Sequence, residues 1–163
     1  EIADETTAKP DYQYPVISGH GGIVSLRDAA EQPRAGTKTV FDLSSPNFMQ
    51  ALERVATEVN LYADAGLNMP DDFQIAVVFH SGATNAVLSD EAVGKHLNHE
   101  KNGALPLIRA LCKAGVEVSV CGQALAHFGF AASEVDPEIS VSVSALTVVN
   151  NKQMDGYNYL GLS

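Results

Sequence analysis

Residues 105–128 read LPLIRALCKAGVEVSVCGQALAHF, and this stretch decides the fold. Pro106 suits the first turn of a helix, and Gly115 is a natural residue to end it. The β-branched run Val116–Val120 predicts a buried strand, and residues 122–128 predict another helix. A helix, a strand and a helix in direct succession are typical of a sheet whose parallel strands are joined by helical crossovers.

The same alternation continues on both sides of this stretch. Three further apolar runs predict buried strands: Thr39–Leu43, Phe73–Phe79 and Ile139–Val143. We expect a helix from Phe48 to near Gly66, a helix pair over Asn85–Leu97, and a last helix from its cap, Ser144, to about Gln153. The predicted fold class is therefore α/β, with an open, mostly parallel sheet and helices on both faces.

Composition excludes several classes of protein. The chain has 163 residues, of which 45% are hydrophobic and 18% charged, so it has enough apolar side chains for one domain with a real core. Its net charge of −10 argues against binding to a phosphate backbone, and we expect no nucleic-acid partner. No apolar run approaches the roughly 20 residues of a membrane-spanning helix, so we expect no membrane insertion.

Residues 1–36 differ in character from the rest, and we predict an N-terminal arm there, followed by the α/β domain over residues 37–163. Prolines and the Gly19–Gly22 cluster make the arm irregular. The arm also carries apolar residues such as Ile17 and Ile23, so we expect it to lie on the domain or on a neighbouring subunit. The sequence begins at Glu1 rather than at Met, which is compatible with a removed export signal.

Ligands of such sheets bind beyond the carboxyl ends of the strands, and this rule selects the candidate residues. Cys121 follows the predicted strand 116–120 and precedes a helix, where N–H groups and the helix dipole favour the nucleophilic thiolate. A buried, structural cysteine is the alternative interpretation. Cys112 lies at the other end of that strand, too far away for a disulfide with Cys121, and we interpret it as part of the core.

His80 ends the predicted strand 73–79 at the same edge of the sheet as Cys121. It could act as a base for the thiol, orient a substrate or bind a metal, and the alternative is a histidine that bonds only its own loop. We predict no metal site. His96 and His99 are three residues apart, a spacing that can hold a metal but is common by chance, and no tight ligand spacing supports a site of His127 with Cys121 and His80. No phosphate-binding glycine pattern follows the first strand, so we also expect no cofactor.

The loops at this edge supply the other candidate residues. Cys121 and His80 are the predicted catalytic pair, and the predicted substrate-binding residues are Gly122, Gln123, Ser81, Gly82, Ser44 and Asn47. The last two open the first long helix, where N–H groups could hold a small anion or where the residues could simply cap the helix.

The segment from Val116 to Leu125, VEVSVCGQAL, resembles the cysteine segment of the DsrE/DsrF-like family. The helix from Leu105 and the run VVFHSGA at Val77–Ala83 fit the same family, and the resemblance covers roughly Lys38 to Tyr159. It implies a DsrE-like fold with flavodoxin-like layering that assembles as a homotrimer or homohexamer, with the last helix or the tail Asp155–Leu162 near the contacts. In the better understood members, the cysteine that matches Cys121 carries sulfur as a persulfide.

This resemblance implies a sulfur carrier or sulfurtransferase, whose partners would be small sulfur species or a sulfur-transfer protein. The alternative function is a non-catalytic oligomeric module that holds a metal or small ligand near Cys121 and His80. The proline-rich arm resembles that of exported members, which favours a periplasmic or otherwise exported protein, with a cytoplasmic location as the alternative.

Overall fold

The computed structural model describes residues 9–163 and is built around a five-stranded sheet in the order β4-β3-β2-β1-β5. All four pairs of neighbouring strands are parallel. The strands are β1 (Thr37–Leu43), β2 (Phe73–Phe79), β3 (Glu117–Cys121), β4 (Ser140–Ser142) and β5 (Asn158–Leu162). The predicted α/β class with a parallel sheet is confirmed.

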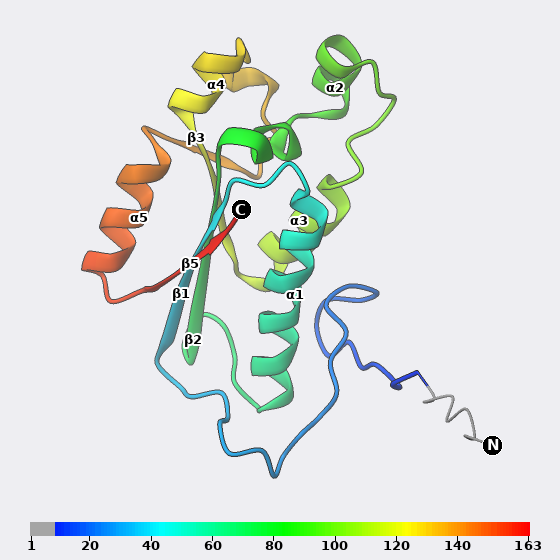
Figure 1. Ribbon diagram of the computed structural model, residues 1–163, viewed down its shortest axis with the longest axis vertical. Helices are drawn as coiled ribbons and strands as arrows, with labels where there is room; N and C mark the ends of the chain where they lie inside the picture. Colours follow the sequence, from blue (N-terminus) through cyan, green and yellow to red (C-terminus); the bar gives the residue numbers. More distant parts are fainter. Residues whose placement is uncertain (1–8) are drawn as a thin grey trace, which may run out of the picture.

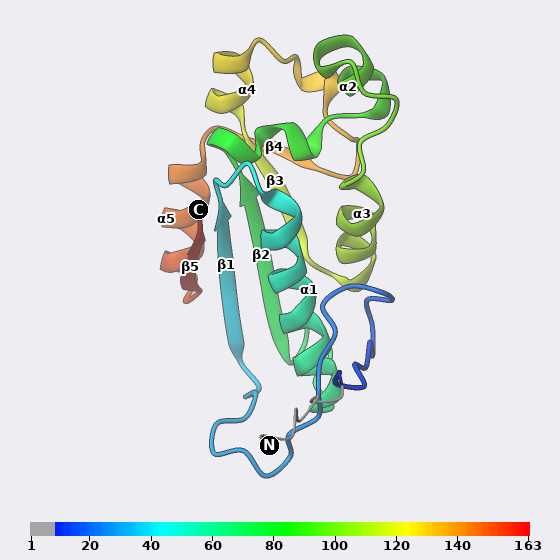
Figure 2. The same ribbon diagram turned by 45° about the vertical axis from the view of Figure 1, so that its right-hand side comes forward.

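Helices cover both faces of the sheet (Figures 1 and 2). One face packs against α1 (Phe48–Asp64) and α3 (Leu105–Ala114), and the other against α5 (Ala145–Met154). Beyond the carboxyl ends of the strands lie α2 (Asp90–Leu97), α4 (Gly122–Phe128) and the 3₁₀ helices η1 (Ser81–Val87) and η2 (Ala132–Glu134). Over residues 9–163, no helix combines the length and hydropathy that crossing a membrane requires.

The core is unequal on the two sides of the sheet. Side chains alternate along a strand, so Phe41, Leu43, Val77 and Phe79 enter a large apolar cluster with α1 and α3. In residues 9–163 the opposite face has only small clusters, to which α5 contributes most of the helical residues and α4 contributes Ala124. The main core therefore lies on the face that α1 and α3 cover.

Most predicted boundaries are confirmed, and three need correction. The pair of helices expected over Asn85–Leu97 is a 3₁₀ helix that begins at Ser81, followed by α2, whose cap Ser89 accepts from the Ala92 N–H at 3.1 Å. The fourth strand is shorter than Ile139–Val143, because only three of its residues pair with β3. The tail was not expected to be a strand, but β5 pairs with β1 along its length.

The N-terminal arm, over the described residues 9–36, lies along α1 of its own chain (Figure 1). Ile17 and Ile23 are buried, and the Asn60 side chain of α1 bonds the backbone of the arm. A Cβ at Gly21 would lie 2.4 Å from the α1 backbone, so only glycine permits this approach. Burial would raise the pKa of Glu53, but hydrogen bonds from His20 and the Gly21 N–H lower it overall.

Candidate functional site

The carboxyl ends of the central strands meet at one edge of the sheet because of their register. Leu43 of β1 pairs with Phe79 of β2, which in turn pairs with Val120 of β3. Extending this register by one residue places His80, directly after β2, beside Cys121, the last residue of β3. The two residues therefore lie at the same edge, where the sequence predicted them.

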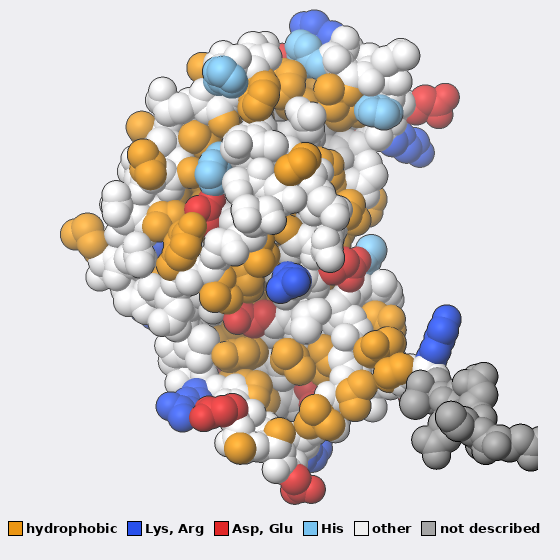
Figure 3. Space-filling view, in the orientation of Figure 1, with side chains coloured by type: hydrophobic (Ala, Val, Ile, Leu, Met, Phe, Trp, Pro, Cys, Tyr) orange, Lys and Arg blue, Asp and Glu red, His pale blue; other side chains and the backbone are white. Residues whose placement is uncertain are grey.

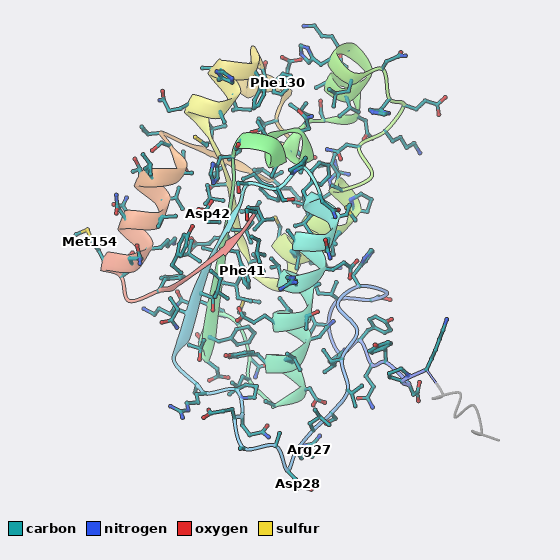
Figure 4. All side chains as sticks on the ribbon, in the orientation of Figure 1. Arg27, Asp28, Phe41, Asp42, Phe130 and Met154 are labelled. Atoms are coloured by element: carbon teal, nitrogen blue, oxygen red, sulfur yellow. The ribbon has the colours of Figure 1, made fainter. Side chains whose placement is uncertain are left out.

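These residues also share one face of the sheet. Val78 and Cys121 belong to one apolar cluster with Ala145 of α5. Because side chains alternate, His80 lies on the same face as Val78, two residues earlier. Asp42 of β1 pairs with Val78 and so faces α5 as well (Figure 4). Three neighbouring strands thus direct an acid, a histidine and a cysteine toward α5.

A cavity of about 440 Å³ lies between this face and α5. Such a volume is in the range of small-molecule sites. The cavity is lined by Asp42, His80, Cys121, Gln123, Ser144, Ala145, Leu146, Val149, Asn150, Gln153 and Tyr159. It has an apolar wall from α5 and a polar end at the strand termini.

Asp42 is the hydrogen-bonding centre of the polar end. One carboxylate oxygen bonds the His80 Nε2, and the other accepts a 2.5 Å hydrogen bond from the hydroxyl of Tyr159 in β5. A carboxylate only accepts, so Nε2 carries the proton in its bond and Nδ1 is the nitrogen left for another partner. The hydrogen bond to Asp42, together with burial and the charge of the acid, raises the pKa of Tyr159, which keeps its hydroxyl a donor at neutral pH.

Cys121 is buried but lies at the cavity wall. Its residue is 6% exposed, and Ala124, Val148 and Val149 pack around its cluster. It also occupies the N-cap position of α4, yet its thiol makes no capping hydrogen bond. Within residues 9–163 no hydrogen bond joins the thiol to His80, although both residues line the same cavity.

The predicted substrate-binding residues divide into one that lines the cavity and five that do not. Gln123 lines it and donates from Nε2 to the Val143 carbonyl at 3.2 Å. A Cβ on Gly122 would lie 2.8 Å from the Ser142 carbonyl, so this glycine serves close packing of α4 on β4. Ser81, with a positive φ of 50°, begins η1, and its carbonyl accepts from the Thr84 hydroxyl.

The loop between β1 and α1 also stays outside this cavity. A Cβ on Gly82 would meet the Ser44 carbonyl at 2.9 Å, which shows how closely the two loops pack. Asn47 lines a separate cavity of about 250 Å³ with Arg54 of α1. The structure thus brings Ser44, Gly82 and Asn47 to the same edge of the sheet but not to the wall that contains Cys121.

The histidines do not gather around Cys121. His96 bonds Glu134 at 2.6 Å, and the ring of His127 lies against Phe128 on α4. In the part of the chain that the structure describes, no group of three or more His, Cys, Asp or Glu side chains is arranged to hold a metal ion. Binding of a metal near Cys121 and His80 gains no support from this geometry.

Asp42 and Tyr159, which form the hydrogen-bonded end of the cavity with His80, were not among the sequence-based candidates. The signal for Asp42 is its charge inside the buried run Val40–Leu43, where an acid needs a partner. Tyr159 gave no comparable signal, because its role depends on β5 pairing beside β1.

Comparison with known proteins supports the assignment that the sequence suggested. The DsrE/DsrF-like family model matches residues 38–162, which is most of the chain. The comparison with curated proteins found no match. Among solved structures, a protein of unknown function from Methanobacterium thermoautotrophicum (MTH1491) is similar, with a TM-score of 0.61 and 19% identity. The similarity covers 77% of this chain and 99% of that one, and it shows a shared fold. The chain belongs to the DsrE/DsrF-like family.

Proposed function

We propose that this protein carries sulfane sulfur on Cys121, accepting it from a persulfide and passing it on to an acceptor thiol. The observation that carries the proposal is the position of Cys121 at the end of β3, in the wall of a cavity that the hydrogen-bonded pair His80 and Asp42 also lines. Membership of the DsrE/DsrF-like family supports a role in sulfur relay in general terms.

The transfer is a thiol exchange in which no electrons are gained or lost overall. The Cys121 thiolate attacks the outer sulfur of a donor R–S–SH, a new S–S bond forms to Cys121, and the donor S–S bond breaks. The donor leaves as R–S⁻, and Cys121 then carries the persulfide. The reverse of this step on an acceptor thiolate delivers the sulfur.

His80 supplies the proton transfers in this scheme. Its Nδ1, opposite the nitrogen that bonds Asp42, accepts the thiol proton through the bound donor or a water molecule and returns it to the leaving R–S⁻. Asp42 stabilises the imidazolium that forms and holds the ring in one orientation. In this scheme the donor lies between His80 and Cys121, which agrees with their positions in the wall of one cavity.

Replacing Cys121 by serine is expected to abolish sulfur loading. The wild-type protein, incubated with a low-molecular-mass persulfide and analysed by mass spectrometry, should gain one sulfur atom on Cys121. The matched control is Cys112→Ser, which should load normally. Burial, followed by the nearby charges of Glu138 and Asp136, raises the pKa of the Cys112 thiol to about 11, so very little of it is thiolate at neutral pH. Equal loading of both cysteines, or loading of the Cys121→Ser variant, would contradict the proposal.

The exposed apolar residues around α5 suggest that copies of this chain associate, and we propose the homotrimer or homohexamer usual in the family. Val143, Leu146 and Met154 are 71%, 77% and 85% exposed. Single hydrophobic side chains lie on the surface over α5 (Figure 3), and Met154 points outward from the end of this helix (Figure 4). Burying such side chains between subunits stabilises an assembly. Light scattering at micromolar concentration should give a mass of three or six chains, and Leu146→Glu should reduce it. A monomer in the wild-type protein would exclude the assembly.

A further inference from the structure

The cavity at Cys121 has one carboxylate and no lysine or arginine among its described lining residues. Asp42 provides that carboxylate, and the polar groups of Gln123, Ser144, Asn150 and Gln153 are uncharged. His80 is hydrogen-bonded to Asp42, so even a protonated imidazole only balances the carboxylate. The lining therefore offers no excess positive charge to an anionic ligand.

The rest of the cavity wall suits the apolar part of a ligand. Ala145, Leu146 and Val149 of α5 form the wall next to Cys121. A group that reaches the sulfur of Cys121 must leave bulk water, and a charge of the same sign as Asp42 then loses hydration while gaining repulsion. An ammonium or a neutral hydrogen-bond donor keeps a favourable contact with the Asp42 carboxylate instead.

We propose that this cavity selects neutral or cationic sulfur donors of low molecular mass, and discriminates against sulfur oxyanions such as thiosulfate and against carboxylate-bearing persulfides. That the selected molecules are sulfur donors rests on the proposed function. The preference for one sign of charge is a property of the cavity itself. The residue that determines the specificity is Asp42. Its neighbour Tyr159 supports it by donating to the second carboxylate oxygen.

Methanethiosulfonate reagents of similar size and opposite charge test the selection independently of sulfur relay. The Cys121 thiolate displaces methanesulfinate and forms a mixed disulfide, so every reagent undergoes the same balanced step. The experiment uses the Cys112→Ser protein, so that one thiol remains, and trimethylammonium-ethyl and sulfonato-ethyl reagents. Each rate is divided by the rate of the same reagent with a free small thiol. About 0.5 M sodium chloride screens the net negative charge of the whole chain.

The normalised rate for the cationic reagent should exceed that for the anionic one by about tenfold or more. Asp42→Asn should reduce this ratio at least about threefold, whatever it does to the absolute rates. The matched control, Asp71→Asn, removes the same charge from an exposed residue just before β2, at the opposite end of the sheet, and should leave the ratio unchanged. A ratio near one, a preference for the anion, or an equal effect of both variants would overturn the inference.

Sulfur loading by matched persulfides separates this inference from the function on which it builds. Persulfides of cysteamine, 2-mercaptoethanol and 3-mercaptopropionate differ mainly in charge. If all three load Cys121 equally, sulfur transfer stands and the charge selection fails. If none loads Cys121 while the charged reagents discriminate as expected, the charge selection stands and the sulfur-carrier function fails. If neither class of reagent modifies Cys121, both proposals fail.

Discussion

Replacing Asn60 by alanine is expected to lower the free energy of unfolding by about 3 kcal/mol and to release the N-terminal arm from α1. The Asn60 side chain is fully buried. Its Oδ1 accepts from the N–H groups of Val16 and Ile17, and its Nδ2 donates to the carbonyls of His20 and Gly21, all at 2.9–3.0 Å. Without it, these buried or partly buried backbone groups lose their partners unless the arm detaches into water.

Urea unfolding and limited proteolysis together measure this effect. The variant should unfold at lower urea concentration, and cleavage should concentrate within the arm. Asn151→Ala on the exposed face of α5 is the matched control and should change stability by less than about 0.5 kcal/mol. A loss below about 1 kcal/mol for Asn60→Ala, with the arm still protected, would show that Asn60 is not what holds the arm.

Glu58 is expected to make the protein more stable in mild acid than in mild base. Burial raises its pKa to about 7 against the opposing effect of a hydrogen bond from Thr39. One carboxyl oxygen accepts from the Thr39 hydroxyl at 3.2 Å, whereas the other is buried without a hydrogen-bond partner. The folded state therefore holds a proton on Glu58 that the unfolded chain releases at lower pH.

The difference in the pKa of Glu58 between the folded and unfolded states fixes the direction in which stability changes with pH. Because the pKa is higher in the folded state, the stabilisation is complete below the unfolded value of 4.5 and is lost as the pH rises through about 7. Between pH 5 and pH 8 the change corresponds to roughly 2–3 kcal/mol. Other groups titrate in this window, so the informative quantity is the difference between the wild-type protein and Glu58→Gln.

Glu58→Gln should remove most of this pH dependence, as measured by thermal or urea unfolding at several pH values. The control variant Glu91→Gln, at an exposed position in α2, should keep the wild-type profile. If Glu58→Gln and the wild-type protein show the same dependence on pH, then Glu58 is ionised in the folded protein and its burial is relieved in another way.

Local sequence patterns predicted the elements that have strong local causes. Pro106 lies in the first turn of α3, and Gly115, with a φ of 108°, ends it. The run Phe73–Phe79 matches β2 residue for residue. The strand β5 was missed because its residues are mostly exposed and include Asn158 and Gly161, which are uncommon in strands. Its pairing with β1 is a long-range contact without a local pattern.

The candidate site likewise has residues that local sequence patterns predicted and residues that only long-range contacts bring in. The sequence by itself determined that Cys121 and His80 lie at the same edge of a parallel sheet, because apolar strands alternate with helices along the chain. Only the tertiary structure decided that Asp42 and Tyr159 join them, that Gln123 lines the cavity, and that Ser44 and Asn47 do not. The physical reason is that strand order, register and the face covered by α5 decide which side chains meet, and these depend on packing between segments far apart in the chain.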